Sequence, residues 1–225
     1  MAYEHTEGIV LRKVDFSETS RIVTFLTPER GRLACMVKGV RRKGSAMASL
    51  LDTYNHLEIT YTWRDSRQVQ LLTEATMLDA FSRLKHDMVR IACAAFLLET
   101  AGLAAQENDP APVLFHALCT GLRRLDAVAC DPCDAAAHAV YATLDAAGFA
   151  PDSSETLFAE QTHRLSRTDR DALLHALESL AQGDATPNTV RPALLFRYFN
   201  EYATYQFERA VKSYAFLASL LEEGG

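Results

Sequence analysis

The chain has 225 residues, of which 48% are hydrophobic and 23% charged, enough for one large globular domain or two small ones. Its formal net charge of −6 arises after residue 80, where 12 Lys and Arg stand against 19 Asp and Glu. The first 80 residues carry eleven Lys and Arg and ten Asp and Glu. The overall acidity argues against binding of a polyanion by bulk charge, but a local basic surface could still bind one. No stretch approaches the roughly 20 apolar residues that cross a bilayer, and the opening MAYEHTEGIVLRK lacks the features of a secretion signal. We therefore expect a cytoplasmic protein that does not enter the membrane.

Residues 6–79 have the pattern of an extended, strand-rich region. In LEITYTW, apolar and aromatic side chains alternate with polar ones, the period of two that marks a half-buried strand. Five strands are expected, at GIVLRKV (8–14), RIVTFLT (21–27), RLACMVK (32–38), LEITYTW (57–63) and QVQLLTEATML (68–78). Five short strands within about 75 residues favour a small closed or nearly closed barrel of the size of an OB-fold.

After residue 80 the pattern becomes helical. Helices are expected over 88–105, 110–127, 134–148, 166–183 and 189–221, with an irregular connection at 149–165. Gly148 and Gly183 suit helix ends, and Ser166 with Asp169 has the spacing of a capping box. The predicted fold class is α+β: a five-stranded OB-fold barrel at residues 1–80, followed by an all-α domain at residues 81–225.

A run of cations in the first part of the chain contains no carboxylate. Its members are Arg30, Arg32, Lys38, Arg41, Arg42 and Lys43. Gly39 and Gly44 let the backbone approach a ligand closely, and Ser45 offers a hydroxyl. On a small barrel this composition is typical of a nucleic-acid groove, so we expect the six cations to contact phosphates. The alternative is an ordinary solvated surface.

Aromatic side chains could supply base stacking, the second component of single-strand binding. The candidates in the barrel region are Phe16, Phe25, Tyr54, Tyr61 and Trp63. Because aromatic residues tend to be buried, we expect each of these to fill the core rather than to stack on bases.

Cys130 and Cys133 have the spacing of one half of a zinc site. A structural zinc needs four ligands, and no second pair follows, although His138 could be a third ligand. Two thiols without metal are therefore expected. The chain also lacks Walker-type, GxSxG and HExxH motifs, so we expect no cofactor and no enzymatic activity.

The segment EGIVLRKVDFSETSRIVTFLTPERGRLACMVKGVRRKGS, residues 7–45, resembles the N-terminal signature of the bacterial RecO family of recombination mediators. The opening GIVL, the acidic loop with Glu18, the TPERGRL turn and the KGVRRKGS loop come in the family's order. Near the C-terminus, VKSYAFL is similar to the family's closing element, and GFAPD at 148–152 is similar to its Gly-aromatic-x-Pro link.

The resemblance implies an OB-fold, joined to a helical domain, that binds single- and double-stranded DNA and anneals complementary strands. It also implies help in loading a RecA-type recombinase onto DNA coated by single-strand-binding protein. The implied partners are RecR and the acidic C-terminal tail of single-strand-binding protein, and the implied location is the cytoplasm, at the nucleoid. Many family members hold zinc with two CxxC pairs after the link. The matching stretch here, DSSETLFAEQTHRLS, has no cysteine, so no zinc is carried over.

An acidic tail with an apolar end needs a hydrophobic pocket with a cation at its rim. The stretch LFHALCTGLRR offers Leu118 and Leu122 beside Arg123 and Arg124, and we expect the tail to bind there unless the arginines merely solvate a helix end. Two other functions stay open. One is an RNA-binding OB-fold protein, since RNA and DNA single strands carry the same backbone charges. The other is a non-catalytic adaptor whose basic loop grips acidic tails.

Overall fold

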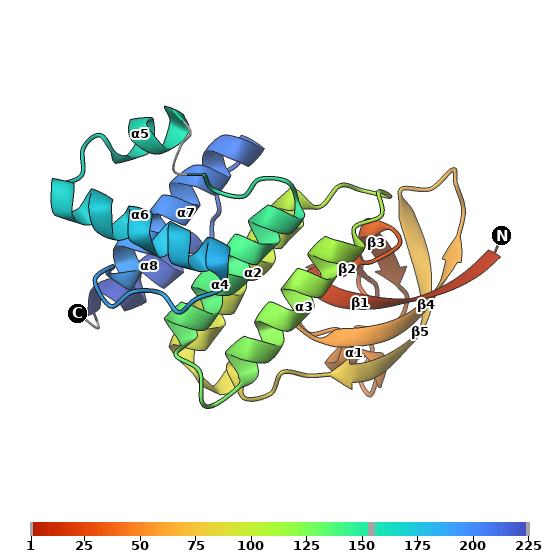
Figure 1. The fold of residues 1–225 in the computed structure, drawn as a ribbon. Coiled ribbons are helices and arrows are strands. Elements are labelled where there is room, and N and C mark those ends of the chain that lie inside the picture. The colour runs from red at the N-terminus through yellow and green to blue at the C-terminus, as the bar shows by residue number, and fades with distance from the viewer. Residues whose placement is uncertain (1, 153–155, 224–225) are drawn as a thin grey trace. The chain divides into compact units, whose positions relative to one another are not determined.

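The computed structural model describes residues 2–152 and 156–223, and the chain divides into two compact units (Figure 1). One unit comprises Met1–Phe81 with Ala105–Cys119, and the other Ser82–Ala104 with Thr120–Gly225. The first unit thus includes a segment beyond the boundary expected near residue 80. Five strands followed by helices confirm the α+β class. Within the described residues, no helix combines the length and the apolar composition that a membrane span requires.

The first unit is built on a closed barrel with the strand order β1-β2-β3-β5-β4. The strands are β1 (Ala2–Asp15), β2 (Arg21–Thr27), β3 (Gly31–Val37), β4 (His56–Trp63) and β5 (Val69–Asp79). Neighbouring strands are antiparallel except β3 and β5, which are parallel. Each expected strand is present, but β1 begins six residues earlier than expected because Ala2 to Gly8 pair with β4. Such long-range pairing leaves no local signal in the sequence.

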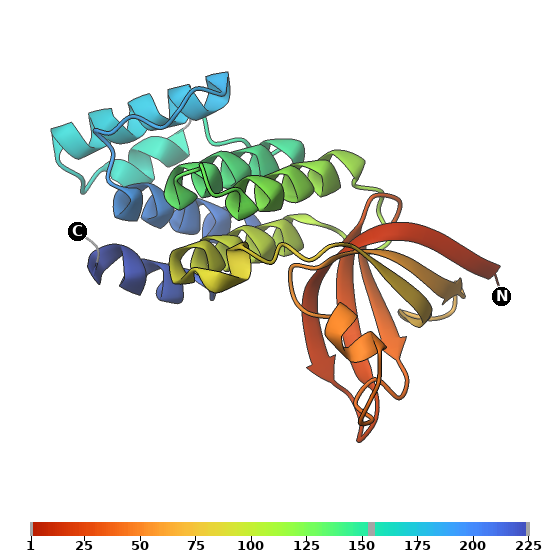
Figure 2. The same cartoon turned by 90° about the horizontal axis from the view of Figure 1, so that it is seen from below.

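Alternate side chains of the strands fill the barrel. Leu57, Ile59 and Tyr61 of β4 are buried, as their spacing predicts. The short helix α1 (Met47–Leu50), which no sequence pattern indicated, packs against this core together with buried Val40; Figure 2 shows it in orange beside the strands. Val40 therefore anchors the loop that precedes α1.

The segment that joins the first unit from further along the chain covers the turn between β2 and β3. The backbone N–H of Arg32 donates to the carbonyl oxygen of Gln106 at 2.9 Å. Gly31 has a left-handed φ of 54°, and a Cβ atom there would lie 2.6 Å from that same oxygen. Only glycine allows the two backbones to approach so closely.

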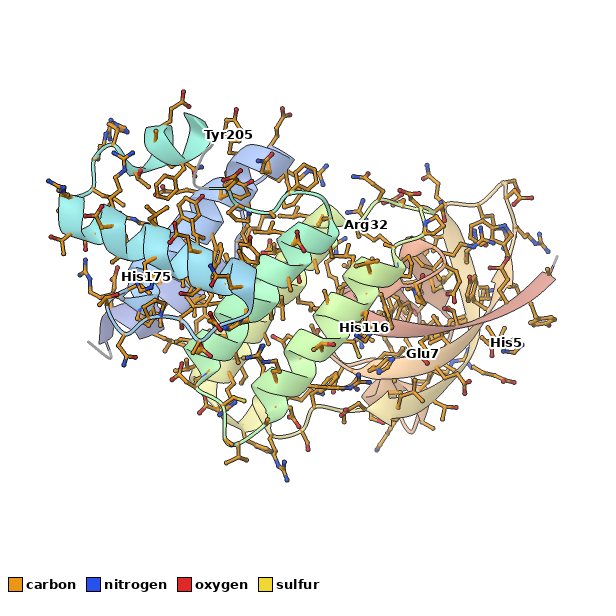
Figure 3. The ribbon with its side chains drawn as sticks, viewed as in Figure 1. His5, Glu7, Arg32, His116, His175 and Tyr205 are labelled. Atoms are coloured by element: carbon orange, nitrogen blue, oxygen red, sulfur yellow. The ribbon has the colours of Figure 1, made fainter. Side chains whose placement is uncertain are left out.

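Helix α3 (Pro112–Asp126) begins in the first unit, where its first half packs on β4. The buried His56 ring meets Phe115 edge to face, with 5.7 Å between the ring centroids, and its Nδ1 lies 3.8 Å from the Cys119 sulfur. Its Nε2 atom lies 2.9 Å from Glu7 Oε2; Figure 3 labels Glu7 on β1. These contacts fix the segment 105–119 to the barrel.

The second unit is helical. Besides the end of α3 it contains η1 (Leu84–His86), α2 (Met88–Ala104), α4 (Pro132–Ala146), α5 (Thr156–Thr162), α6 (Arg167–Gln182), α7 (Pro192–Phe207) and α8 (Tyr214–Glu223). The expected helix signals are confirmed: the Ser166 hydroxyl accepts from Asp169 N–H at the start of α6, and Gly148 and Gly183 take left-handed conformations after α4 and α6.

Two helix predictions were wrong. The expected helix at 189–221 is broken, because Glu208 takes a left-handed φ of 52° and the Glu99 carboxylate accepts the backbone N–H groups of Lys212 and Ser213 before α8 begins. The expected irregular connection at 149–165 contains α5; residues 153–155 of that stretch lie outside the described residues. In the first case a distant carboxylate stabilises a new helix start.

Candidate nucleic-acid interface

The loop between β3 and α1, residues 38–46 and here called the basic loop, is a defined structure. Buried Val40 fixes its middle, and Gly39 and Gly44 take left-handed φ values of 71° and 83°. Its backbone also bonds to the loop between β1 and β2, where Arg41 N–H donates to the Thr19 carbonyl at 3.2 Å. The two loops are therefore neighbours at one end of the barrel.

Three cations of the basic loop are free to meet a ligand. Lys38, Arg42 and Lys43 are exposed, and no carboxylate within residues 2–152 and 156–223 forms an ion pair with any of them. We call them the open cations. Because their charge is not neutralised internally, they produce the strongest uncompensated positive potential among the six predicted contacts.

Arg41 is partly occupied. Its Nε lies 3.3 Å from Asp15 Oδ2, and its Nη1 donates to the Ser17 carbonyl at 2.5 Å. Asp15 also accepts from Arg21 Nε at 2.8 Å. The hydrogen bond from Arg21, together with the nearby charge of Arg41, lowers the pKa of Asp15 despite some desolvation. Arg41 thus links the two loops. Because Asp15 neutralises part of its charge, Arg41 can attract a phosphate less strongly than an unpaired arginine.

Arg30 interacts with residues of the barrel. Its guanidinium forms a two-point ion pair with Glu4, at 2.6 and 3.2 Å, and lies 4.0 Å from the centroid of the Trp63 ring. Tyr61 donates a hydrogen bond to the same carboxylate at 2.7 Å. Burial raises the pKa of Glu4, but the hydrogen bonds from Arg30 and Tyr61 outweigh it, and the net shift is downward. This carboxylate stays ionised and neutralises Arg30.

Arg32 is also paired. Its Nη2 lies 3.1 Å from Glu107 Oε1, while its backbone bonds to Gln106 as described above. Figure 3 labels this arginine on β3. The run of six cations is therefore divided by the fold: Arg30 and Arg32 hold the structure together, Arg41 links two loops, and the three open cations face solvent. Sequence reasoning missed this division because Glu4 and Glu107 lie far away along the chain.

One aromatic side chain accompanies the basic loop. Phe16, in the neighbouring β1–β2 loop, is 60% exposed, so its predicted place in the core was wrong. Phe25 and Tyr61 are buried as expected, and Tyr54 and Trp63 are half-buried. The signal for Phe16 was available, because it stands outside the alternating part of its strand, in the polar stretch DFSETS. An exposed ring beside open cations is the combination that binds single strands.

Comparisons with known proteins show which family the chain belongs to. A model described as recombination protein O N terminal matches residues 1–81, and one described as recombination protein O C terminal matches residues 85–171. The DNA repair protein RecO of Nocardioides sp. is 34% identical over 196 residues, which cover 84% of this chain and 79% of that protein. The chain belongs to the RecO family.

Other RecO proteins match over a shorter stretch. Those of Salinibacter ruber and Exiguobacterium sibiricum are 33% and 32% identical over 121 and 123 residues, or 54% and 55% of this chain. These matches span 46% and 49% of the two relatives, about half of their length. The three relatives are each named DNA repair protein RecO.

The predicted tail site of this RecO-family chain lies on α3. Leu118 and Leu122 are fully buried, at 0% exposure, whereas Arg123 and Arg124 are exposed. A peptide can contact only exposed side chains, so the two leucines cannot line its pocket in this conformation. Of the four residues predicted for this site, Arg123 and Arg124 are the two that a peptide could contact.

The cysteines that raised the zinc question are half-buried in the second unit. Cys130 precedes α4, and Cys133 is in its first turn, after the N-cap Asp131. No group of three or more His, Cys, Asp or Glu side chains in the described part of the chain is arranged to hold a metal ion.

Proposed function

We propose that this RecO-family chain binds single- and double-stranded DNA through the basic loop and Phe16. The observation that carries the proposal is the exposure of Lys38, Arg42 and Lys43, none of which has a carboxylate partner among the residues that the structure describes. Each can neutralise one phosphate and release condensed counterions, and this contribution does not depend on base sequence. The exposed Phe16 ring adds a surface on which an unpaired base can stack.

Annealing follows from the same surface. Two complementary single strands repel each other through their phosphates, and cations that contact both of them screen that repulsion. A loop that holds the strands through their backbones leaves the base edges free to pair. We propose that the chain anneals strands in this way in the cytoplasm and helps a RecA-type recombinase onto DNA coated by single-strand-binding protein.

The proposed protein partners are RecR and the acidic C-terminal tail of single-strand-binding protein. The family resemblance supports both, and the exposed Arg123 and Arg124 support an acidic ligand. The test is the affinity of a labelled tail peptide for the wild type and for Arg123→Glu with Arg124→Glu. Unchanged affinity in a folded variant would place the tail site elsewhere.

The experiment that tests nucleic-acid choice is a competition between DNA and RNA oligomers of equal length and sequence, followed by fluorescence anisotropy. Preferential displacement of labelled DNA by DNA supports the proposal. Preferential displacement by RNA would favour the RNA-binding alternative. Failure of the labelled DNA and of a labelled RNA to bind at all, with binding of an acidic peptide retained, would favour the protein adaptor.

A further inference from the structure

The outer face of the barrel carries a row of aliphatic side chains that crosses four strands. Its members, each the cross-strand partner of the next, are Val14 of β1, Ile22 of β2, Met36 of β3 and Leu71 of β5. Successive side chains of a strand point to opposite faces. Because Val23 and Cys35 are buried inside the barrel, their neighbours Ile22 and Met36 point outward. We call these four side chains the aliphatic row.

The aliphatic row is accessible to a partner. Val14 is 46% exposed, and the other three side chains are half-buried. The neighbouring row on the same face, which is also paired in register, consists of Arg12, Thr24, Ala34 and Val69. With strands about 4.8 Å apart, the aliphatic row spans about 14 Å. An apolar strip of this kind with polar residues at its rim marks a binding surface.

Two cations border the row. Arg12 precedes Val14 by two residues on the same face of β1, and Lys38 stands just beyond the end of β3. Both are exposed, and neither forms an ion pair with a carboxylate in the part of the chain that the structure describes. Asp15, next to Val14, is already paired with Arg21 and Arg41. The border therefore favours a partner that carries carboxylates.

The chemistry of the row indicates a protein segment rather than nucleic-acid bases. Bases stack on aromatic rings, and the row contains none; Phe16 lies beyond it, in the loop after β1. The barrel is closed and the row's strands are paired on both sides, so a peptide cannot join them as a further strand. An extended peptide lying across the row would bury its own unpaired N–H and C=O groups. A helix satisfies those groups internally.

We propose that the aliphatic row binds an amphipathic helix of another protein, with aliphatic residues on one face and carboxylates beside that face. Side chains three and four residues apart on a helix lie about 5–6 Å from each other, close to the spacing of the strands. At 1.5 Å per residue, about nine residues of helix cover the row. Arg12 and Lys38 then meet the carboxylates that flank the aliphatic face.

The test uses the full chain and a fluorescent synthetic helix with leucines on one face and glutamates beside them. The helix should bind, and the Met36 methyl signal, assigned among the five methionines by Met36→Leu, should shift in a carbon-13 NMR spectrum. The same helix with lysines in place of the glutamates should bind at least about tenfold more weakly. Equal affinities of the two helices, or no binding of the acidic one, would overturn the proposal.

Variants of the row identify the binding surface. Ile22→Thr with Met36→Thr, which keeps the β-propensity, should weaken binding of the acidic helix at least about tenfold. Leu78→Thr removes a 47% exposed aliphatic side chain of β5 outside the row and should leave the affinity unchanged. Arg12→Glu leaves the row intact and should weaken the acidic helix by about threefold. Circular dichroism confirms that each variant is folded.

Two other occupants of the row give different results. If unpaired bases lie on it, a labelled single strand shifts the Met36 methyl signal, and Ile22→Thr with Met36→Thr weakens binding of that strand but not of the acidic helix. If a second copy of this chain covers it, the wild type is a dimer in sedimentation and the double variant is a monomer. Either result would overturn the proposal of a helical partner.

Discussion

Replacing Lys38, Arg42 and Lys43 together by alanine should weaken DNA binding in a way that depends on salt. Each open cation is exposed and lacks an internal carboxylate partner among the described residues, so each is available to neutralise one phosphate. Arg41 stays in place because it links two loops through Asp15 and Ser17.

The size of the effect follows from counterion release. At roughly 0.7 per phosphate contact on a single strand, loss of three contacts makes the slope of log affinity against log salt shallower by about 2. Between 50 and 200 mM salt, the wild type should then lose about 20-fold more affinity than the variant. Stability should change by no more than about 0.5 kcal/mol, since the side chains are exposed.

The assay is a salt titration of fluorescence anisotropy with a labelled single strand. The matched control is Arg30→Ala with Arg32→Ala, which removes cations from the same run that are already paired with Glu4 and Glu107. This control should keep the wild-type slope but lose roughly 1–2 kcal/mol of stability, because it removes the partly buried Arg30–Glu4 pair and the contact of Arg30 with Trp63; the exposed Arg32–Glu107 pair adds little. Equal slopes in all three proteins would refute the assignment of the open cations.

Two further substitutions test the site and the fold. Phe16→Ala should weaken single-strand binding by about 1–3 kcal/mol and duplex binding much less, because bases in a duplex are already stacked. Tyr3→Ala, which removes a 63% exposed ring from β1, should change neither, and an equal loss in both variants would contradict a stacking role for Phe16. Gly31→Ala should lower the free energy of unfolding, measured with urea, for two reasons. An alanine in a left-handed conformation costs about 1–2 kcal/mol by itself, and its Cβ would also clash with the Gln106 carbonyl, so the total loss should be larger. Gly44→Ala, with a similar φ of 83° and open space around it, should show only the backbone cost, and equal losses would mean that the close approach at Gly31 does not matter.

Local patterns in the sequence predict much of this fold. The alternation of residues 57–61 in β4 and the capping pair Ser166 and Asp169 each depend on residues close together in the chain, and each is confirmed; at the end of β4 the alternation fails, because Thr62 is buried and Trp63 is half-buried. The break before α8 could not be predicted in this way, because it depends on Glu99, more than a hundred residues earlier.

The same distinction applies to the candidate site. The sequence shows six cations without an intervening carboxylate, but it does not show which carboxylates the fold brings to them. Glu4 reaches Arg30 only because β1 closes the barrel beside β4, and Glu107 reaches Arg32 only because residues 105–111 cover the β2–β3 turn. The charge pattern thus predicts where the basic region lies, and only contacts between residues far apart in the chain separate open cations from paired ones.

The most direct test of the central claim is annealing of two complementary strands, each coated with single-strand-binding protein, followed by energy transfer between end labels. The wild type and Arg30→Ala with Arg32→Ala should both anneal the strands. The variant without Lys38, Arg42 and Lys43 should be slower by at least about tenfold at physiological salt, because the surface that holds both backbones has lost three phosphate contacts. Annealing by that folded variant at the wild-type rate would contradict the claim that the basic loop binds the DNA strands.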